Sequence, residues 1–154
     1  MSIEIHDVTQ ENESAILKLS VAKEQKGFIE TPLECLQEAK EDLHYHPVGL
    51  FADSKLVGFA MYGYFPNEDG DQVWLDRFLI DAKFQGQGLG KIMLQALIEK
   101  LTNEFNCQKI YLSVYEDNPG AIHLYKKFGF EFNGELDVHN EKVMVKAVLL
   151  NPTL

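Results

Sequence analysis

The residues best suited to chemistry lie in a glycine-rich segment, residues 85–91, which we call the glycine loop and which reads Gln-Gly-Gln-Gly-Leu-Gly-Lys. It follows a strand-like run at 73–80 and precedes a stretch with apolar residues at helical spacing. The first N–H groups of a helix have no intrahelical partner and lie at its positive end. Because glycine lacks a Cβ atom, a ligand can come close to such a backbone. The segment therefore predicts a phosphate-binding loop.

The spacing within the glycine loop argues against two common phosphate motifs. Its alternating glycines differ from the G-x-G-x-x-G pattern of dinucleotide sites, and the acidic residue expected about 20 positions later falls near Ile110. A nucleoside triphosphate loop would need Gly at position 85 and Ser or Thr at position 92, which are Gln85 and Ile92. Neither class of nucleotide is expected.

A second segment shows the signals of a short helix over 119–128. Residues 110–115 have the composition of a buried strand, and Asn118 can cap a helix that begins at Pro119. Gly129 stands where such a helix would end.

These two segments carry a family resemblance. The patterns Gln85-x-x-Gly88-x-Gly90 and Asn118-x-x-Ala121-x-x-x-Tyr125-x-x-x-Gly129-Phe130 resemble those of the GNAT superfamily of N-acetyltransferases. Further stretches look similar to bacterial spermine/spermidine acetyltransferases of the diamine type: 47–50, 56–63, 74–78 and 141–146. The resemblance implies acetyl-CoA as cofactor and direct transfer of its acetyl group to a primary amine, with a polyamine such as spermidine or spermine as the expected acceptor.

The resemblance also implies roles for individual residues. Tyr125 would serve the leaving sulfur as a proton donor, and Asp76 would accept the amine proton directly or through water. The cofactor would contact Phe78, Leu79, Ile80, Gln85, Gly86, Gln87, Gly88, Leu89, Gly90, Lys91, Asn118 and Tyr125. The pantetheine arm would lie in a splay between strands 72–81 and 108–115. The amine would be lined by Phe28, Glu30, Tyr45, Trp74 and Asp76, since polycations favour separated carboxylates and aromatic faces.

Several alternatives remain open from the residues alone. Tyr125 could instead be an aromatic residue packed on the sheet, and Asp76 could form a salt bridge to a neighbour. The acceptor could be another amine, such as an aminoglycoside or a protein N-terminus. A non-catalytic acyl-CoA-binding module would share the same motifs.

Composition favours a small cytoplasmic enzyme with one domain spanning 1–154. A formal net charge of −10 opposes nucleic acid as a partner and favours cationic ligands. No membrane span or signal peptide is expected, because no run of 18 apolar residues occurs. His44 and His46 lack further ligands nearby and the two cysteines lack C-x-x-C spacing, so no metal is expected. The oligomeric state is open, with a homodimer as one option.

The order of elements predicts an α/β fold of the GNAT type. Strands are expected at 3–8, 48–52, 55–64, 72–81, 108–115, 130–137 and 141–148, and helices at 11–22, 88–105 and 119–128. A further helix would begin at Thr31, where T-x-x-E forms a capping box. Hairpins early in the chain and strand–helix alternation later imply a mixed sheet of about seven strands flanked by about four helices.

Overall fold

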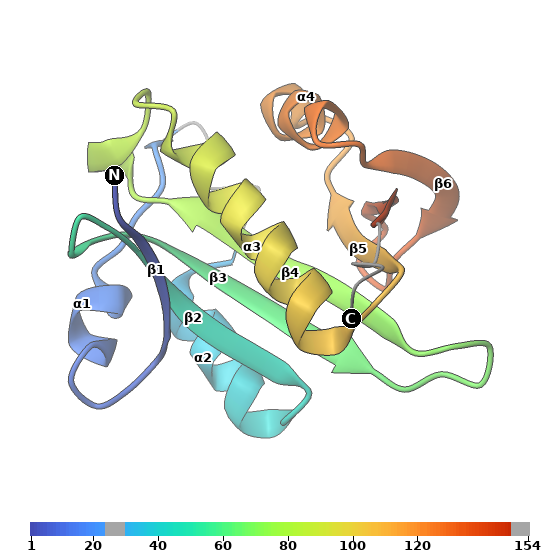
Figure 1. The fold of residues 1–154 in the computed structure, drawn as a ribbon, viewed down its shortest axis with the longest axis horizontal. Coiled ribbons are helices and arrows are strands. Elements are labelled where there is room, and N and C mark those ends of the chain that lie inside the picture. The colour runs from blue at the N-terminus through green and yellow to red at the C-terminus, as the bar shows by residue number, and fades with distance from the viewer. Residues whose placement is uncertain (24–29, 149–154) are drawn as a thin grey trace. The chain divides into compact units, whose positions relative to one another are not determined.

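The computed structural model describes residues 1–23 and 30–148, and their elements follow the predicted order (Figure 1). The strands are β1 (Ile3–Asp7), β2 (Tyr45–Ala52), β3 (Lys55–Phe65), β4 (Gln72–Ile80), β5 (Lys109–Val114), β6 (Glu131–Leu136) and β7 (Lys142–Ala147). The helices are α1 (Glu13–Leu17), α2 (Pro32–Glu41), α3 (Leu89–Phe105) and α4 (Pro119–Lys127), with a 3₁₀ turn at Ala82–Phe84.

The strands form one mixed sheet in the order β1-β2-β3-β4-β5-β7-β6. β4 and β5 are parallel and pair at Val73↔Ile110 and Trp74↔Tyr111, whereas β5 and β7 are antiparallel. The fold class expected from the sequence is therefore confirmed.

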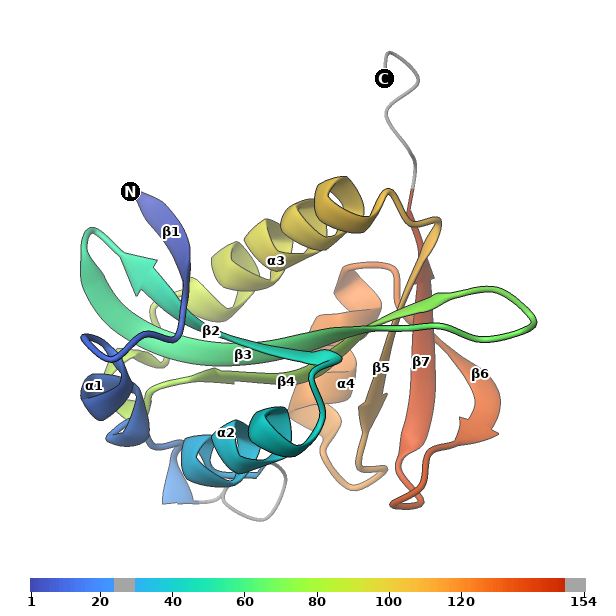
Figure 2. The same cartoon turned by 90° about the horizontal axis from the view of Figure 1, so that it is seen from below.

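The chain divides into two compact units. Unit 1 contains Met1–Gly63 and Asp76–Leu94, and unit 2 contains Tyr64–Leu75 and the chain from Gln95 onwards. In unit 1, α1 and α2 lie on one face of β2 and β3, and the start of α3 lies on the other face (Figure 2). A buried cluster joins α1 and α2 to the strands: Ile16, Leu19, Cys35, Leu36, Phe59, Met61 and Leu79.

Unit 2 contains β5, β6, β7 and α4. Its buried apolar side chains come from the later part of α3, from the strands and from the residue before β6: Leu97, Leu101, Ile110, Leu112, Phe130 and Met144.

The first predicted helix is much shorter than expected. Helix 11–22 is reduced to α1, because the backbone around Ser20 bonds to another part of the chain instead of continuing the helix. Ser20 N–H donates to Asp81 Oδ2 at 3.2 Å, and Ser20 C=O accepts from Ala82 N–H at 2.7 Å. These tertiary bonds replace intrahelical ones.

Two local predictions are confirmed in detail. The β2–β3 hairpin turns at Asp53 and Ser54, which have φ of 48° and 68°, as a tight hairpin turn requires. Thr31 caps α2, its side-chain oxygen accepting from Glu34 N–H at 3.2 Å, while Glu34 Oε1 accepts from Thr31 N–H at 3.1 Å. This capping box fixes the start of the helix that packs on β2.

Candidate active site

The glycine loop has the backbone that an anion site requires. Gly86 and Gly88 both have φ of 79°, a region that L-residues rarely adopt. A Cβ atom built on either glycine would meet no atom of the described residues within 4 Å apart from its chain neighbours, so the space beside the backbone is open. Leu89 is buried and begins α3, which directs the first N–H groups of the helix toward the loop. The loop therefore fits the phosphates of acetyl-CoA.

Side chains on either side of the loop attach it to the end of β4. Gln85 Nε2 donates to the carbonyl oxygen of Ile80 at 2.9 Å, so this side chain supports the loop from within the protein. Asp81 is buried, and its two oxygens accept from Lys83 N–H at 2.9 Å and from Ser20 N–H at 3.2 Å. Sequence reasoning missed Asp81, although Asp at the start of a turn is a common capping signal.

The predicted cofactor strand is closely packed in unit 1. Leu79 and Ile80 are buried, and Phe78 is partly buried. A Cβ atom at Gly58 would lie 2.4 Å from the carbonyl oxygen of Leu79, so only glycine allows β3 to approach β4 this closely. The backbone at Leu79 is therefore closely packed against β3, in the strand beside which the resemblance expects the pantetheine arm.

Asp76 has the electrostatic character of a proton acceptor. Its Oδ2 is buried and has no hydrogen-bond partner within residues 1–23 and 30–148. The pKa of the carboxyl is raised from 3.8 to about 8, mainly by burial; Arg77 opposes the rise, and Glu38 and Asp42 add to it. Both protonation states are therefore available near neutral pH, which suits a general base.

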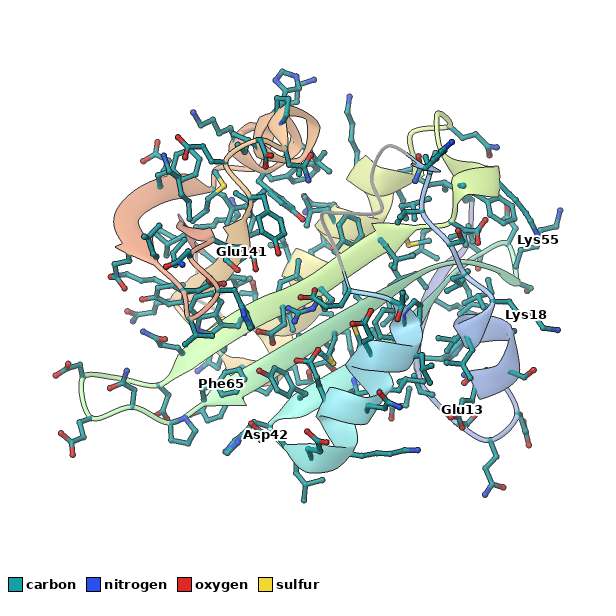
Figure 3. All side chains as sticks on the ribbon, turned by 180° about the vertical axis from the view of Figure 1, so that it is seen from behind. Glu13, Lys18, Asp42, Lys55, Phe65 and Glu141 are labelled. Carbon is teal, nitrogen blue, oxygen red and sulfur yellow. The ribbon has the colours of Figure 1, made fainter. Side chains whose placement is uncertain are left out.

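Arg77, which sequence reasoning did not assign, lies at the centre of a group of charged side chains beside α2. Its Nε lies 2.7 Å from Glu30 Oε2, in an ion pair not aligned as a hydrogen bond, and its Nη2 donates to Glu38 Oε1 at 3.4 Å. Arg77 is largely buried, whereas Glu30 and Glu38 are about one-third exposed. Asp42, labelled in Figure 3, caps the C-terminus of the same helix.

The predicted amine-lining residues have different surroundings. Glu30 is paired with Arg77, so an internal cation already neutralises it. Tyr45 packs against the unit 1 core, and burial raises the pKa of its hydroxyl, with Asp76 and Glu38 adding to the effect. Phe28 lies outside the described residues.

Trp74 belongs to unit 2 and is engaged by its neighbours. Its ring stacks on Tyr111, with 5.3 Å between centroids, and its Nε1–H donates to Gln72 Oε1 at 3.0 Å. One face and the N–H group of the indole therefore contribute to the packing of β4 and β5.

The second motif forms the start and the end of α4. Asn118 caps the helix, its Oδ1 accepting from Ala121 N–H at 3.4 Å. Tyr125 packs edge-on against Phe130 with 5.9 Å between ring centroids. Burial raises the pKa of the Tyr125 hydroxyl to about 12, and the nearby Glu141, labelled in Figure 3, adds to this shift. The phenol therefore keeps its proton at every physiological pH.

The predicted site residues are divided between the two units. Unit 1 contains Glu30, Tyr45, residues 76–80 and the glycine loop, whereas unit 2 contains Trp74, Asn118 and Tyr125. Within unit 1, Glu30 acts electrostatically on Arg77, and both Asp76 and Arg77 act on the Tyr45 hydroxyl. The splay between β4 and β5, and the assembly of all these residues into one site, stay predictions.

His44 and His46 contact carboxylates, and no metal cluster occurs in the described part of the chain. His44 Nδ1 lies 2.8 Å from Asp42 Oδ1, and His46 Nε2 lies 2.6 Å from Asp7 Oδ1. Nowhere in the described ranges do three His, Cys, Asp or Glu side chains meet as a metal site would require. The same ranges contain no helix of the length and apolarity needed to cross a membrane.

Comparison with known proteins places this fold and these motifs in a family. The model of the acetyltransferase (GNAT) family matches residues 6–130. The spermine/spermidine N(1)-acetyltransferase of Bacillus subtilis strain 168 is 55% identical over 152 residues, covering 96% of this chain and all of the relative.

Solved structures share the fold at lower identity. The PaiA N-acetyltransferase of Thermoplasma acidophilum, crystallised with coenzyme A, is 19% identical, with a TM-score of 0.67 over 96% of this chain and 100% of that chain. An aminoglycoside acetyltransferase in complex with coenzyme A has a TM-score of 0.75 at 20% identity over 95% of both chains.

The chain belongs to the GNAT family of acetyltransferases. The predictions of an N-acetyltransferase and of acetyl-CoA as the acetyl donor are thereby confirmed at the level of the family.

Proposed function

We propose that this enzyme acetylates a primary amine of a polyamine such as spermidine or spermine. The proposal rests on the surroundings of the Asp76 carboxyl. Its Oδ2 is buried without a hydrogen-bond partner in the described structure, and further acidic groups lie near it. A cationic amine is the natural ligand of such surroundings. The 55% identical relative, named for spermine and spermidine, supports the same acceptor class.

Asp76 would prepare the amine for attack. An ammonium group has no free electron pair, so a proton must leave before or during the reaction. A nearby ammonium stabilises the carboxylate form of Asp76 and lowers its pKa, since opposite charges favour ionisation. The arriving substrate therefore favours the state of Asp76 that can accept its proton.

The glycine loop and Asn118 would hold acetyl-CoA, with residues 78–80 beside the reacting end. Bound there, acetyl-CoA supplies the acetyl group as an activated thioester. The N–H groups of Leu79 and Ile80 would donate to the carbonyl oxygen, where negative charge develops.

Tyr125 would donate to the departing sulfur. A thiol has a pKa near 8.5 and the Tyr125 hydroxyl one of about 12, so complete proton transfer is strongly uphill. We therefore propose that Tyr125 stabilises the thiolate by donating a hydrogen bond. This role does not require the proton to be transferred.

Recognition of the remaining ammonium groups would involve Glu30, with Tyr45, Trp74 and Phe28 supplying aromatic surfaces. Aromatic faces attract cations most strongly when the pair is shielded from water. Glu30 must share its charge with Arg77, so we assign it a contribution to polyamine affinity and no direct contact with the reacting atoms.

We further propose that residues 1–154 form one functional domain that works in the cytoplasm, and that the enzyme is a homodimer. Sedimentation or light scattering of the purified protein tests the dimer, and localisation of a tagged chain tests the compartment.

The release of coenzyme A from acetyl-CoA, measured across a panel of amines, tests the function. We expect kcat/KM to be highest for spermidine or spermine, lower for a monoamine of similar length, and lowest for aminoglycosides and peptide N-termini. If an aminoglycoside or a peptide N-terminus is acetylated faster than every polyamine, the acceptor class is wrong while the chemistry stands. Tight acetyl-CoA binding without turnover of any amine would indicate a binding module.

A further inference from the structure

The Arg77 guanidinium has three nitrogens, and each lies against an oxygen other than those of the Asp76 carboxyl. Nε lies 2.7 Å from Glu30 Oε2, and Nη2 donates to Glu38 Oε1 at 3.4 Å. Nη1 donates to the backbone carbonyl oxygen of Asp76 at 2.7 Å. The guanidinium is thus held by two carboxylates from the α2 side and by the β4 backbone.

This arrangement has a consequence for the neighbouring side chain. Asp76 precedes Arg77 in the chain, yet Asp76 Oδ2 is buried without a hydrogen-bond partner in the described structure. If the Arg77 guanidinium were oriented toward this carboxylate, the two groups would form a strong bidentate pair. Such a pair would hold Asp76 in its ionised form and weaken it as a base.

We propose that Glu30 and Glu38 are positioning residues that hold the Arg77 guanidinium away from the Asp76 carboxylate, leaving Asp76 free for the substrate cation. The inference rests on the proposed function, in which Asp76 accepts the amine proton. It assigns Glu38 and Arg77 to the reaction although neither needs to touch the substrate.

The other titratable groups described near Asp76 supply no second cation that could pair with it. Asp42 at the end of α2 and Tyr45 on β2 both act on Asp76 or respond to it, and neither carries positive charge. Cys35, on α2 beside Arg77, is buried, and burial raises the pKa of its thiol to about 12. The thiol therefore stays neutral and, although it interacts with Arg77, adds no negative charge beside the guanidinium.

The proposal predicts the direction of a titration. Replacing Glu38 by Gln removes one of the two anions that hold Arg77, so the guanidinium can turn to Asp76 and stabilise its ionised form. An opposite charge within about 4–6 Å lowers the pKa of a carboxyl by about 1–3 units. Glu30→Gln should act in the same direction, and the double variant should act most strongly.

The experiment follows the Asp76 carboxyl carbon by NMR in the ligand-free protein, with Asp76→Asn to assign its signal. We expect the Asp76 midpoint to fall by at least about one pH unit in Glu38→Gln. Glu38→Asp keeps the charge and should restore much of the wild-type midpoint. Glu41→Gln, an exposed change on the same helix, should leave the midpoint unchanged.

A double-mutant cycle separates action through Arg77 from direct repulsion between Glu38 and Asp76. In an Arg77→Gln background, the effect of Glu38→Gln on the Asp76 midpoint should shrink to less than half. If Arg77→Gln does not fold, Arg77→Lys takes its place, because an ammonium cannot reproduce the planar fork. An equal effect in both backgrounds, or no effect in either, overturns the proposal.

The pH profile of kcat/KM separates this inference from the proposed function. A fall in the NMR midpoint together with a matching fall in the kinetic midpoint supports both. A fall in the NMR midpoint alone upholds the positioning role and removes Asp76 as the base.

Discussion

At the scale of single residues, burial acts on Asp76 and Tyr125 in the same direction with opposite chemical results. Loss of solvation raises the pKa of both side chains, because the charged form of each is the one that burial penalises. For Asp76 the pKa moves to about 8, into the range where a base operates. For Tyr125 it moves to about 12, so the phenol acts only as a neutral donor.

The raised pKa of Asp76 makes protein stability depend on pH. The unfolded carboxyl loses its proton near pH 3.8, whereas the folded one keeps it until about pH 8, so the folded state binds the extra proton in between. This contribution is therefore fully present below about pH 4 and is lost as the pH rises to 8. Asparagine does not titrate in this range. We therefore expect Asp76→Asn to abolish the decrease in the free energy of unfolding that deprotonation of Asp76 causes between about pH 4 and 8.

Urea unfolding at a series of pH values between 4 and 9 checks this. The wild-type and Asn curves should converge on the acid side and diverge in favour of Asn on the alkaline side. Parallel curves would show that the folded Asp76 titrates normally.

Tyr125→Phe keeps the ring that packs on Phe130 and removes only the hydroxyl. We expect kcat to fall by on the order of 10²-fold, with little change in KM for acetyl-CoA, since one hydrogen bond to developing negative charge contributes at about that scale. Steady-state kinetics measures both constants. Wild-type turnover in a folded variant would reduce Tyr125 to a packing residue.

At the scale of elements, side-chain hydrogen bonds from within the glycine loop and from the turn before it attach it to the rest of unit 1. Asp81 and Gln85 attach it to the chain near Ser20 and to the end of β4, while α3 begins at its far side. The loop backbone can therefore present its N–H groups without help from a bound ligand. Preorganisation of this kind reduces the ordering cost of binding.

Gly88→Val should raise the KM for acetyl-CoA far more than the KM for amine, because its side chain would occupy the open space beside the loop. The matched control is Gly70→Val, since Gly70 also has positive φ and nothing within 4 Å of a built Cβ atom. Both changes strain the backbone, so they should cost similar stability, and only the first should weaken acetyl-CoA binding. Equal kinetics for the two variants would argue against the loop as the phosphate site.

At the scale of the whole molecule, the formal charge of −10 produces a negative field that attracts polycations. Charged pairs that contact water contribute only about 0.2–1 kcal/mol each, so a strong preference for polyamines requires pairs that are shielded in the site. The overall charge would speed the encounter, and the local carboxylates would select the acceptor.

Salt distinguishes these two contributions. We expect the ratio of kcat/KM for spermine to that for a monoamine to fall as salt is raised to about 0.5 M, where exposed charges are largely screened. Glu30→Gln should reduce the same ratio at low salt, mainly through KM for the polyamine. A ratio that stays constant with salt would mean that selection does not depend on accessible charges.

Local patterns in the sequence determined much of this protein. The T-x-x-E box placed the start of α2, Asn118 and Pro119 placed the start of α4, and the alternating glycines gave the loop its left-handed backbone. These features act over a few residues, so neighbouring residue types suffice to predict them. The two motifs together also identified the family, and the strand and helix order identified the fold.

Tertiary structure alone decided features that join distant parts of the chain. α1 ends at Leu17 because Ser20 bonds to Asp81, 61 residues away, and helical periodicity contains no trace of that contact. The pKa of Asp76 and the ion pairs of Arg77 likewise depend on burial against α2, since solvation and charge act through space and not along the sequence. The residue types therefore identify the groups that can react, and the packing around these groups sets their protonation states.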